Sequence, residues 1–185
     1  MAFPASPPLV MLIRHGEKPP DGGGLPNGVD DDGNVSEFSL TPKGWSRAGA
    51  LVKFFRVPSV AGIETPKVIY AAAPVQKKGS PHGCRPSETV TPLAQAAGPG
   101  VRFDTTFAVT QEGSLVQAIL QEPGVVLVCW EHHALTTIVQ GLLSDPTFTL
   151  PYDGTRFDLV WLLRPGDTGI TVAMQALLFG DAGVT

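Results

Sequence analysis

The residues best suited to chemistry follow two runs of apolar residues. Residues 9–13 read LVMLI and are followed at once by Arg14 and His15. The run VVLVCW is followed in the same way by Glu131 and His132. An arginine can hold a phosphate or carboxylate through two parallel hydrogen bonds, and a neighbouring imidazole can act as a nucleophile or a base. The two segments therefore predict a site for an anionic ligand.

Taken alone, the pair Arg14 and His15 also fits a structural role, in which the arginine caps carbonyl groups beside a hydrogen-bonded histidine. Each histidine, however, lies two residues beyond the last apolar residue of its run. If the runs are parallel strands, their carboxyl ends meet at one edge of the sheet, where ligands bind in such folds. Further positive charge is expected there from the segment after a third apolar run, which carries Lys77, Lys78, His82 and Arg85.

The elements that position these residues are expected to be short strands alternating with helices. Apolar, β-branched runs bordered by Gly or Pro predict strands at 9–13, 67–72, 124–130, 157–163 and 169–178. Apolar residues at helical spacing predict a helix that starts at Thr41 and Pro42, and others within 86–98, 112–121 and 133–143. The link RPGDTG leaves no room for a crossover helix, so the last two strands are expected to form an antiparallel hairpin. The pattern predicts a layered α/β fold.

The length of 185 residues suits a single domain over residues 1–185. A long segment at about 18–40, rich in Gly, Pro and Asp, is either a functional lid or a mobile insertion. If it covers the site, its charge should disfavour polyanionic substrates; otherwise it is a solvated loop. Its charged residues are Lys18, Asp21, Asp30, Asp31, Asp32 and Glu37.

The composition excludes several classes of partner. The net charge is −4, and no stripe of arginines and aromatic residues is visible, so no nucleic-acid partner is expected. The sequence lacks both a basic leader with an apolar core and an apolar stretch long enough for a membrane helix. We therefore expect a soluble, cytoplasmic protein without a membrane partner. Its two cysteines are too few for a disulfide framework and are interpreted as reduced thiols.

Four ordered segments resemble the histidine phosphatase superfamily, also called phosphoglycerate mutase-like. They are LIRHGEK after the first strand, LTPKGWSRAGAL in the first helix, RPSET after the second strand, and VCWEHHAL, and together they span residues 9–143. The resemblance implies a three-layer α/β/α sandwich with a mostly parallel central sheet and the C-terminal hairpin. It also implies metal-independent hydrolysis of phosphomonoesters, without a cofactor, on a phosphorylated small molecule or a phosphoprotein.

Carried over residue by residue, the resemblance implies that His15 is the nucleophile that becomes a phosphohistidine. Arg14, Arg85 and His132 would surround the phosphoryl oxygens. His132 matches the family position, whereas His133 falls in the first turn of the next helix, where a solvent-facing side chain is more common. The family more often has Ser-His-Gly where this chain has the residues EHH, which suggests narrower access.

The proton donor for the leaving alcohol is the least determined residue. The resemblance points to Glu112, because the mutase-like branch tends to place a glutamate in a loop some distance after the second arginine, here Arg85. The alternative is that Glu112 only complements the positive end of a helix. Glu17 and Glu131 are rivals because they adjoin the site.

Three other functions stay open at this point. The first two are a binding member of the fold without catalysis and a phosphoglycerate mutase-like phosphotransferase. The third is a zinc hydrolase that uses His82, His132, His133 and a carboxylate, although the chain has no HExxH motif.

Overall fold

A six-stranded sheet forms the centre of the computed structural model, which describes residues 8–77, 80–151 and 153–182. The strand order is β5-β2-β6-β1-β7-β8. The first four strands in this order run parallel, whereas β7 is antiparallel to β1 and β8 is antiparallel to β7. The predicted hairpin is therefore confirmed. The strands are β1 (Leu9–Arg14), β2 (Val68–Ala71), β5 (Arg102–Asp104), β6 (Val125–Trp130), β7 (Leu159–Leu163) and β8 (Thr171–Met174).

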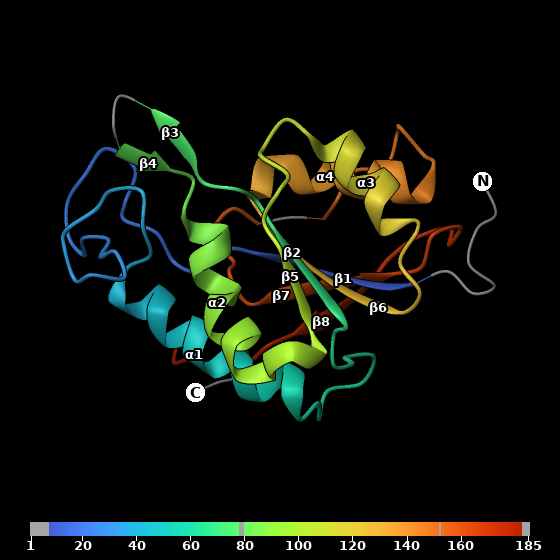
Figure 1. Cartoon of the computed structure of the whole chain (residues 1–185), viewed down its shortest axis with the longest axis horizontal. Helices are drawn as coiled ribbons and strands as arrows, with labels where there is room; N and C mark the ends of the chain where they lie inside the picture. Colours follow the sequence, from blue (N-terminus) through green and yellow to red (C-terminus); the bar gives the residue numbers. More distant parts are fainter. Residues whose placement is uncertain (1–7, 78–79, 152, 183–185) are drawn as a thin grey trace.

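Helices cover both faces of this sheet, so the α/β/α sandwich is confirmed. Figure 1 shows α1 and α2 on one side of the sheet and α3 and α4 on the other. A short 3₁₀ helix, η1 (Gly98–Gly100), follows α2. The four helices are α1 (Pro42–Arg56), α2 (Arg85–Ala97), α3 (Glu112–Ile119) and α4 (His132–Leu143).

The central strand β1 shows why the apolar runs are continuous. Successive side chains of a strand point to opposite faces of the sheet. Leu12 packs in the apolar cluster beneath α3 and α4, whereas Met11 and Ile13 pack in the cluster beneath α1 and α2. Both faces are buried, and a strand of this kind needs apolar residues at every position.

The helix boundaries follow local signals in the sequence. The Thr41 hydroxyl accepts a hydrogen bond from the Gly44 amide at 3.3 Å and so caps α1, with Pro42 as the first helical residue. Gly98 ends α2 in a backbone conformation with φ of 64°. Pro92 lies inside α2, which begins at Arg85.

Two small elements have no counterpart among the predicted strands. β5 is a three-residue edge strand, RFD, whose two charged residues hide the apolar signal. The segment after β2 contains an antiparallel pair of three-residue strands, β3 (Val75–Lys77) and β4 (Ser80–His82). Among the described residues, no helix has the length and apolarity that crossing a membrane requires.

The segment 18–40 is attached to both helices of the adjoining layer. The Trp45 indole of α1 donates a hydrogen bond to the Val29 carbonyl at 2.8 Å. The Leu40 amide donates to the Glu88 carboxylate of α2 at 2.9 Å. Within the segment, Val29 and Val35 form an isolated antiparallel bridge. The segment therefore has a defined course beside the start of α2.

Candidate active site

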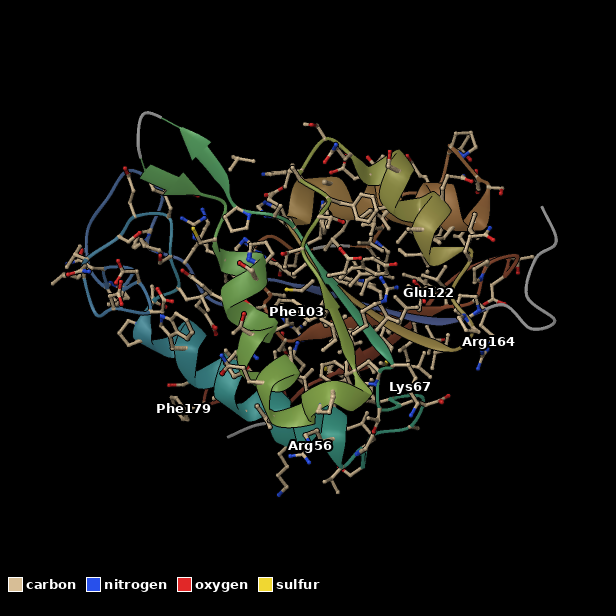
Figure 2. The ribbon with its side chains drawn as sticks, viewed as in Figure 1. Arg56, Lys67, Phe103, Glu122, Arg164 and Phe179 are labelled. Atoms are coloured by element: carbon tan, nitrogen blue, oxygen red, sulfur yellow. The ribbon has the colours of Figure 1, made fainter. Side chains whose placement is uncertain are left out.

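The strand ends bring the predicted histidines together. Arg14 is the last residue of β1 and lies in register with Trp130, the last residue of β6. His15 and His132 follow within two residues, and their ring centroids are 6.4 Å apart in an edge-on arrangement. The opposite end of the sheet is far from this chemistry: Figure 2 shows Lys67, Glu122 and Arg164 there, beyond the amino ends of the parallel strands.

The His15 side chain is buried, with only 2% of its surface exposed. Its Nδ1 lies 2.8 Å from the Gly16 carbonyl oxygen. A carbonyl can only accept, so Nδ1 must carry the proton, and Nε2 keeps its lone pair. Burial, together with the charges of Arg14 and Arg85, lowers the pKa of His15 to about 3. The ring is therefore neutral at physiological pH, which is the state that a nitrogen nucleophile needs.

Close backbone packing fixes the loop that follows His15. A Cβ atom on Gly16 would lie 3.1 Å from the Gly44 carbonyl oxygen, and one on Gly44 would lie 2.5 Å from the Glu17 carbonyl oxygen. The Gly16 amide donates to the Thr89 hydroxyl at 2.8 Å, and that hydroxyl donates to the Arg85 carbonyl at 2.7 Å. The loop is thereby tied to both α1 and α2. Sequence reasoning missed Thr89, although it lies within the RPSET segment.

The Arg14 guanidinium is contacted by residues of the segment before β7, far from it in the sequence. It lies 3.8 Å above the centre of the Phe157 ring, and its Nη1 donates to the Gly154 carbonyl at 2.7 Å and to the Arg156 carbonyl at 3.3 Å. The Phe157 ring centroid is also 6.2 Å from that of His15. Phe157 is a second site residue that sequence reasoning missed, because no motif marks the segment before β7.

The Arg85 guanidinium joins the start of α2 to the segment 18–40. Its Nε donates to the Ser39 carbonyl at 3.4 Å, and its Nη2 donates to the Glu37 carbonyl. The residue is half-buried, and burial lowers its pKa. Its positive charge contributes to the lowered pKa of His15. The Glu88 carboxylate of the same helix accepts from the Leu40 amide, next to the Ser39 carbonyl that Arg85 contacts.

Acidic residues of the segment 18–40 lie near these cations. A hydrogen bond from Lys18 lowers the pKa of Asp21, and the charges of Arg85 and His132 lower it further. A cleft of about 880 Å³ also lies between this segment and α2. The acidic residues that line it are Asp30, Asp31, Asp32, Glu37 and Glu88. The expected discrimination against polyanionic substrates stays a prediction.

The two histidines at the start of α4 differ in exposure. The side chain of His132 is only 14% exposed, whereas that of His133 is 81% exposed, in agreement with the predicted solvent-facing position. Burial, followed by the charge of Arg14, lowers the pKa of His132 to about 4. His132 Nδ1 lies 2.9 Å from Glu131 Oε1. Glu131 also caps α4, because its Oε2 accepts from the His133 amide at 2.9 Å.

The three candidate acids occupy different environments. Glu112 begins α3 and is 8% exposed, and its Oε1 accepts from the Trp130 indole and the Thr110 amide, each at 3.0 Å. Glu131 contacts His132, as described above. Glu17 instead forms an ion pair with the buried Arg47 at 2.7 Å.

The ion pair of Glu17 belongs to a buried network on the α1 side of the sheet. Arg47 is 1% exposed, and its Nη2 also lies 2.7 Å from Asp181 Oδ1. Its Nη1 donates to the Gln175 side chain at 2.9 Å. With its charge committed to this network, Glu17 is a weaker candidate for the acid. The predicted contributions of Lys77, Lys78 and His82 lie outside the described side chains.

Comparisons with known proteins agree with this architecture. The sequence matches no family model and no curated protein. A mutant phosphoserine phosphatase from Entamoeba histolytica, solved with phosphoserine, has a TM-score of 0.50 and 14% identity, over 91% of this chain and 97% of that one. The same organism's phosphoserine phosphatase with 3-phosphoglyceric acid has a TM-score of 0.49 and 17% identity, over 92% and 99%.

A third similar structure is a provisionally assigned phosphohistidine phosphatase SixA from Nakamurella multipartitia. It has a TM-score of 0.47 and 17% identity, over 92% of this chain and 96% of that chain. At these identities the similarity concerns the fold alone. The chain has a three-layer α/β/α fold similar to that of the solved phosphoserine phosphatase from Entamoeba histolytica.

Proposed function

We propose that the protein is a metal-independent phosphomonoester hydrolase that acts through a phosphohistidine on His15. The observation that carries this proposal is the buried, neutral imidazole of His15, whose Nδ1 is fixed on the Gly16 carbonyl. Such a ring presents Nε2 as a nucleophile without a separate base. The fold, which the chain shares with solved phosphatases, supports a phosphatase at the coarse level.

In the first half-reaction, Nε2 of His15 attacks phosphorus, and the bond from phosphorus to the leaving oxygen breaks. Negative charge on the three equatorial oxygens is stabilised by Arg14 and Arg85, which are held rigidly by Phe157 and by backbone carbonyls. His132, whose ring centroid lies 6.4 Å from that of His15, borders the same site. Positioned cations of this kind need no reorganisation as the charge develops.

The leaving alkoxide takes a proton from a carboxylic acid, which we propose to be Glu112. Its carboxylate is buried and accepts a hydrogen bond from the indole of Trp130, the last residue of β6. Glu131 is the alternative, since it already contacts His132. In the second half-reaction, water gives a proton to the same carboxylate and attacks phosphorus. The bond to Nε2 breaks, and His15 returns to its neutral state with inorganic phosphate as the product.

The test is hydrolysis of an aryl phosphate in the presence of EDTA, across mildly acidic to neutral pH. The variants are His15→Ala and, as the matched control, His133→Ala, which removes an exposed imidazole next to the site. We expect turnover by the wild type and by His133→Ala, and a loss of at least about 1000-fold in His15→Ala. Acid-labile labelling of the protein by the phosphoryl group should disappear with His15.

The outcome also separates the other readings of the fold. Turnover that survives in His15→Ala contradicts the phosphohistidine mechanism. Absence of turnover in every variant, combined with phosphate binding, indicates a binding protein. Transfer of the label to an added alcohol in preference to water indicates a phosphotransferase.

A further inference from the structure

Glu131, His132 and His133 form a cluster that the proposed mechanism does not explain fully. One ligand atom from each residue lies within 4.8 Å of the other two. His132 Nδ1 is 2.9 Å from Glu131 Oε1, and His133 Nε2 is 4.0 Å from the same oxygen. Two imidazoles and a carboxylate form a donor set typical of Zn²⁺ sites, in which three protein ligands leave a position open.

The backbone creates this arrangement. Neighbouring side chains in a strand point apart, but β6 ends at Trp130 and α4 begins at His132, so Glu131 stands at a corner of the chain. The two imidazole rings consequently lie with centroids only 3.7 Å apart. The corner gathers three consecutive side chains on one side of the helix start.

Helix capping accounts for only one of the two carboxylate oxygens. Oε2 of Glu131 accepts from the His133 amide, which is sufficient for an N-cap. The other oxygen, Oε1, is turned toward both imidazole rings. A carboxylate oriented by a backbone hydrogen bond, with its second oxygen shared between two ring nitrogens, is organised as metal ligands are.

We propose that Glu131, His132 and His133 bind a divalent transition-metal ion of the Zn²⁺ type, and that the bound ion inhibits the phosphatase. The binding does not depend on the proposed function, whereas the inhibition rests on it. His133 is largely exposed, so the ion can enter from solvent. Nitrogen ligands favour Zn²⁺, Co²⁺ and Cu²⁺ over Mg²⁺ and Ca²⁺, which prefer sets of oxygen atoms.

The position of the cluster supplies the reason for inhibition. His132 belongs to both sites, and its ring centroid is 6.4 Å from that of the candidate nucleophile. An ion on Nδ1 of His132, with an open coordination position, would bind an oxygen of the phosphate product. That contact would delay the release of phosphate and hence the next turnover.

Cobalt provides a test of binding that does not depend on activity. Protein freed of metal with EDTA and then dialysed is titrated with Co²⁺, and the visible absorption of the bound ion is followed; Zn²⁺ is then added as a competitor. We expect saturation at one ion per chain in the wild type, displacement by Zn²⁺, and no displacement by Mg²⁺. Binding should be at least about 10-fold weaker in His133→Ala and in Glu131→Gln.

The same variants link binding to activity. Wild-type turnover should fall as Zn²⁺ is added, whereas His133→Ala should keep its turnover over the same range of concentrations. Absence of saturable Co²⁺ absorption in the wild type, or equal affinity in His133→Ala, would overturn the metal site. Binding without inhibition of an active enzyme would overturn the coupling. A protein that is inactive even in EDTA contradicts the proposed function, while the cobalt titration still decides the binding.

Discussion

Acid destabilisation of the folded protein is the sharpest prediction from the buried imidazole of His15. Its pKa is about 3 in the folded protein, against 6.5 as the ordinary value. Below about pH 6.5, the unfolded chain therefore binds a proton on this residue that the folded protein does not bind. The free energy of unfolding must fall as the pH falls, and this contribution continues to grow until about pH 3.

The magnitude follows from the two pKa values. Each pH unit below the unfolded pKa costs about 1.4 kcal/mol of stability, so His15 alone removes about 2 kcal/mol between about pH 7.5 and pH 5.0. Replacement by asparagine removes the titration, while its side-chain amide can still donate to the Gly16 carbonyl. His15→Asn should therefore lose about 2 kcal/mol less than the wild type on the same acidification.

Urea unfolding of both proteins at both pH values measures this difference. Other titrating groups are common to the two proteins and cancel in the comparison, whatever the substitution does to the stability at neutral pH. Equal losses on acidification would refute the reasoning, because His15 would then ionise in the folded protein as readily as in water. The proposed nucleophile would then no longer be a desolvated, neutral ring at mildly acidic pH.

Three further substitutions test other parts of the structure. Arg47→Met should lower the free energy of unfolding by about 3–5 kcal/mol, because two carboxylates lose their buried partner; a urea-unfolding loss below about 1 kcal/mol would contradict this. Gly44→Ala places a Cβ atom 2.5 Å from the Glu17 carbonyl oxygen, in the loop after His15. It should lower the free energy of unfolding by about 1–3 kcal/mol and remove most of the turnover. Gly49→Ala is the control in the same helix: its Cβ would have no atom within 4 Å, so stability and turnover should be unchanged or stability slightly higher. Glu112→Gln should lower kcat for alkyl phosphates by about 10²–10⁴-fold and affect activated aryl phosphates less; the same pattern in Glu131→Gln alone would assign the acid to that residue.

The sequence by itself was enough to predict the α/β layers and the edge of the sheet at which the candidate site residues lie. LVMLI and VVLVCW are apolar at every position, as expected of strands buried on both faces, and both are central strands of the sheet. Because the carboxyl ends of parallel strands share an edge, the positions of Arg14, His15 and His132 followed from the strand ends alone. The roles of these residues stay proposals, as does that of Arg85.

Only the tertiary structure decided how these side chains are held. Arg14 stacks on Phe157, and the two residues lie far apart in the sequence, so no local pattern links them. Glu17 is adjacent to His15's loop in sequence, but its carboxylate pairs with the buried Arg47. The Glu131 carboxylate instead contacts His132, because β6 ends and α4 begins around Glu131. The spacing of apolar residues along the sequence shows only which faces of a single strand or helix are buried. The partner of a polar side chain depends on which other element packs against it, and long-range packing alone sets that choice.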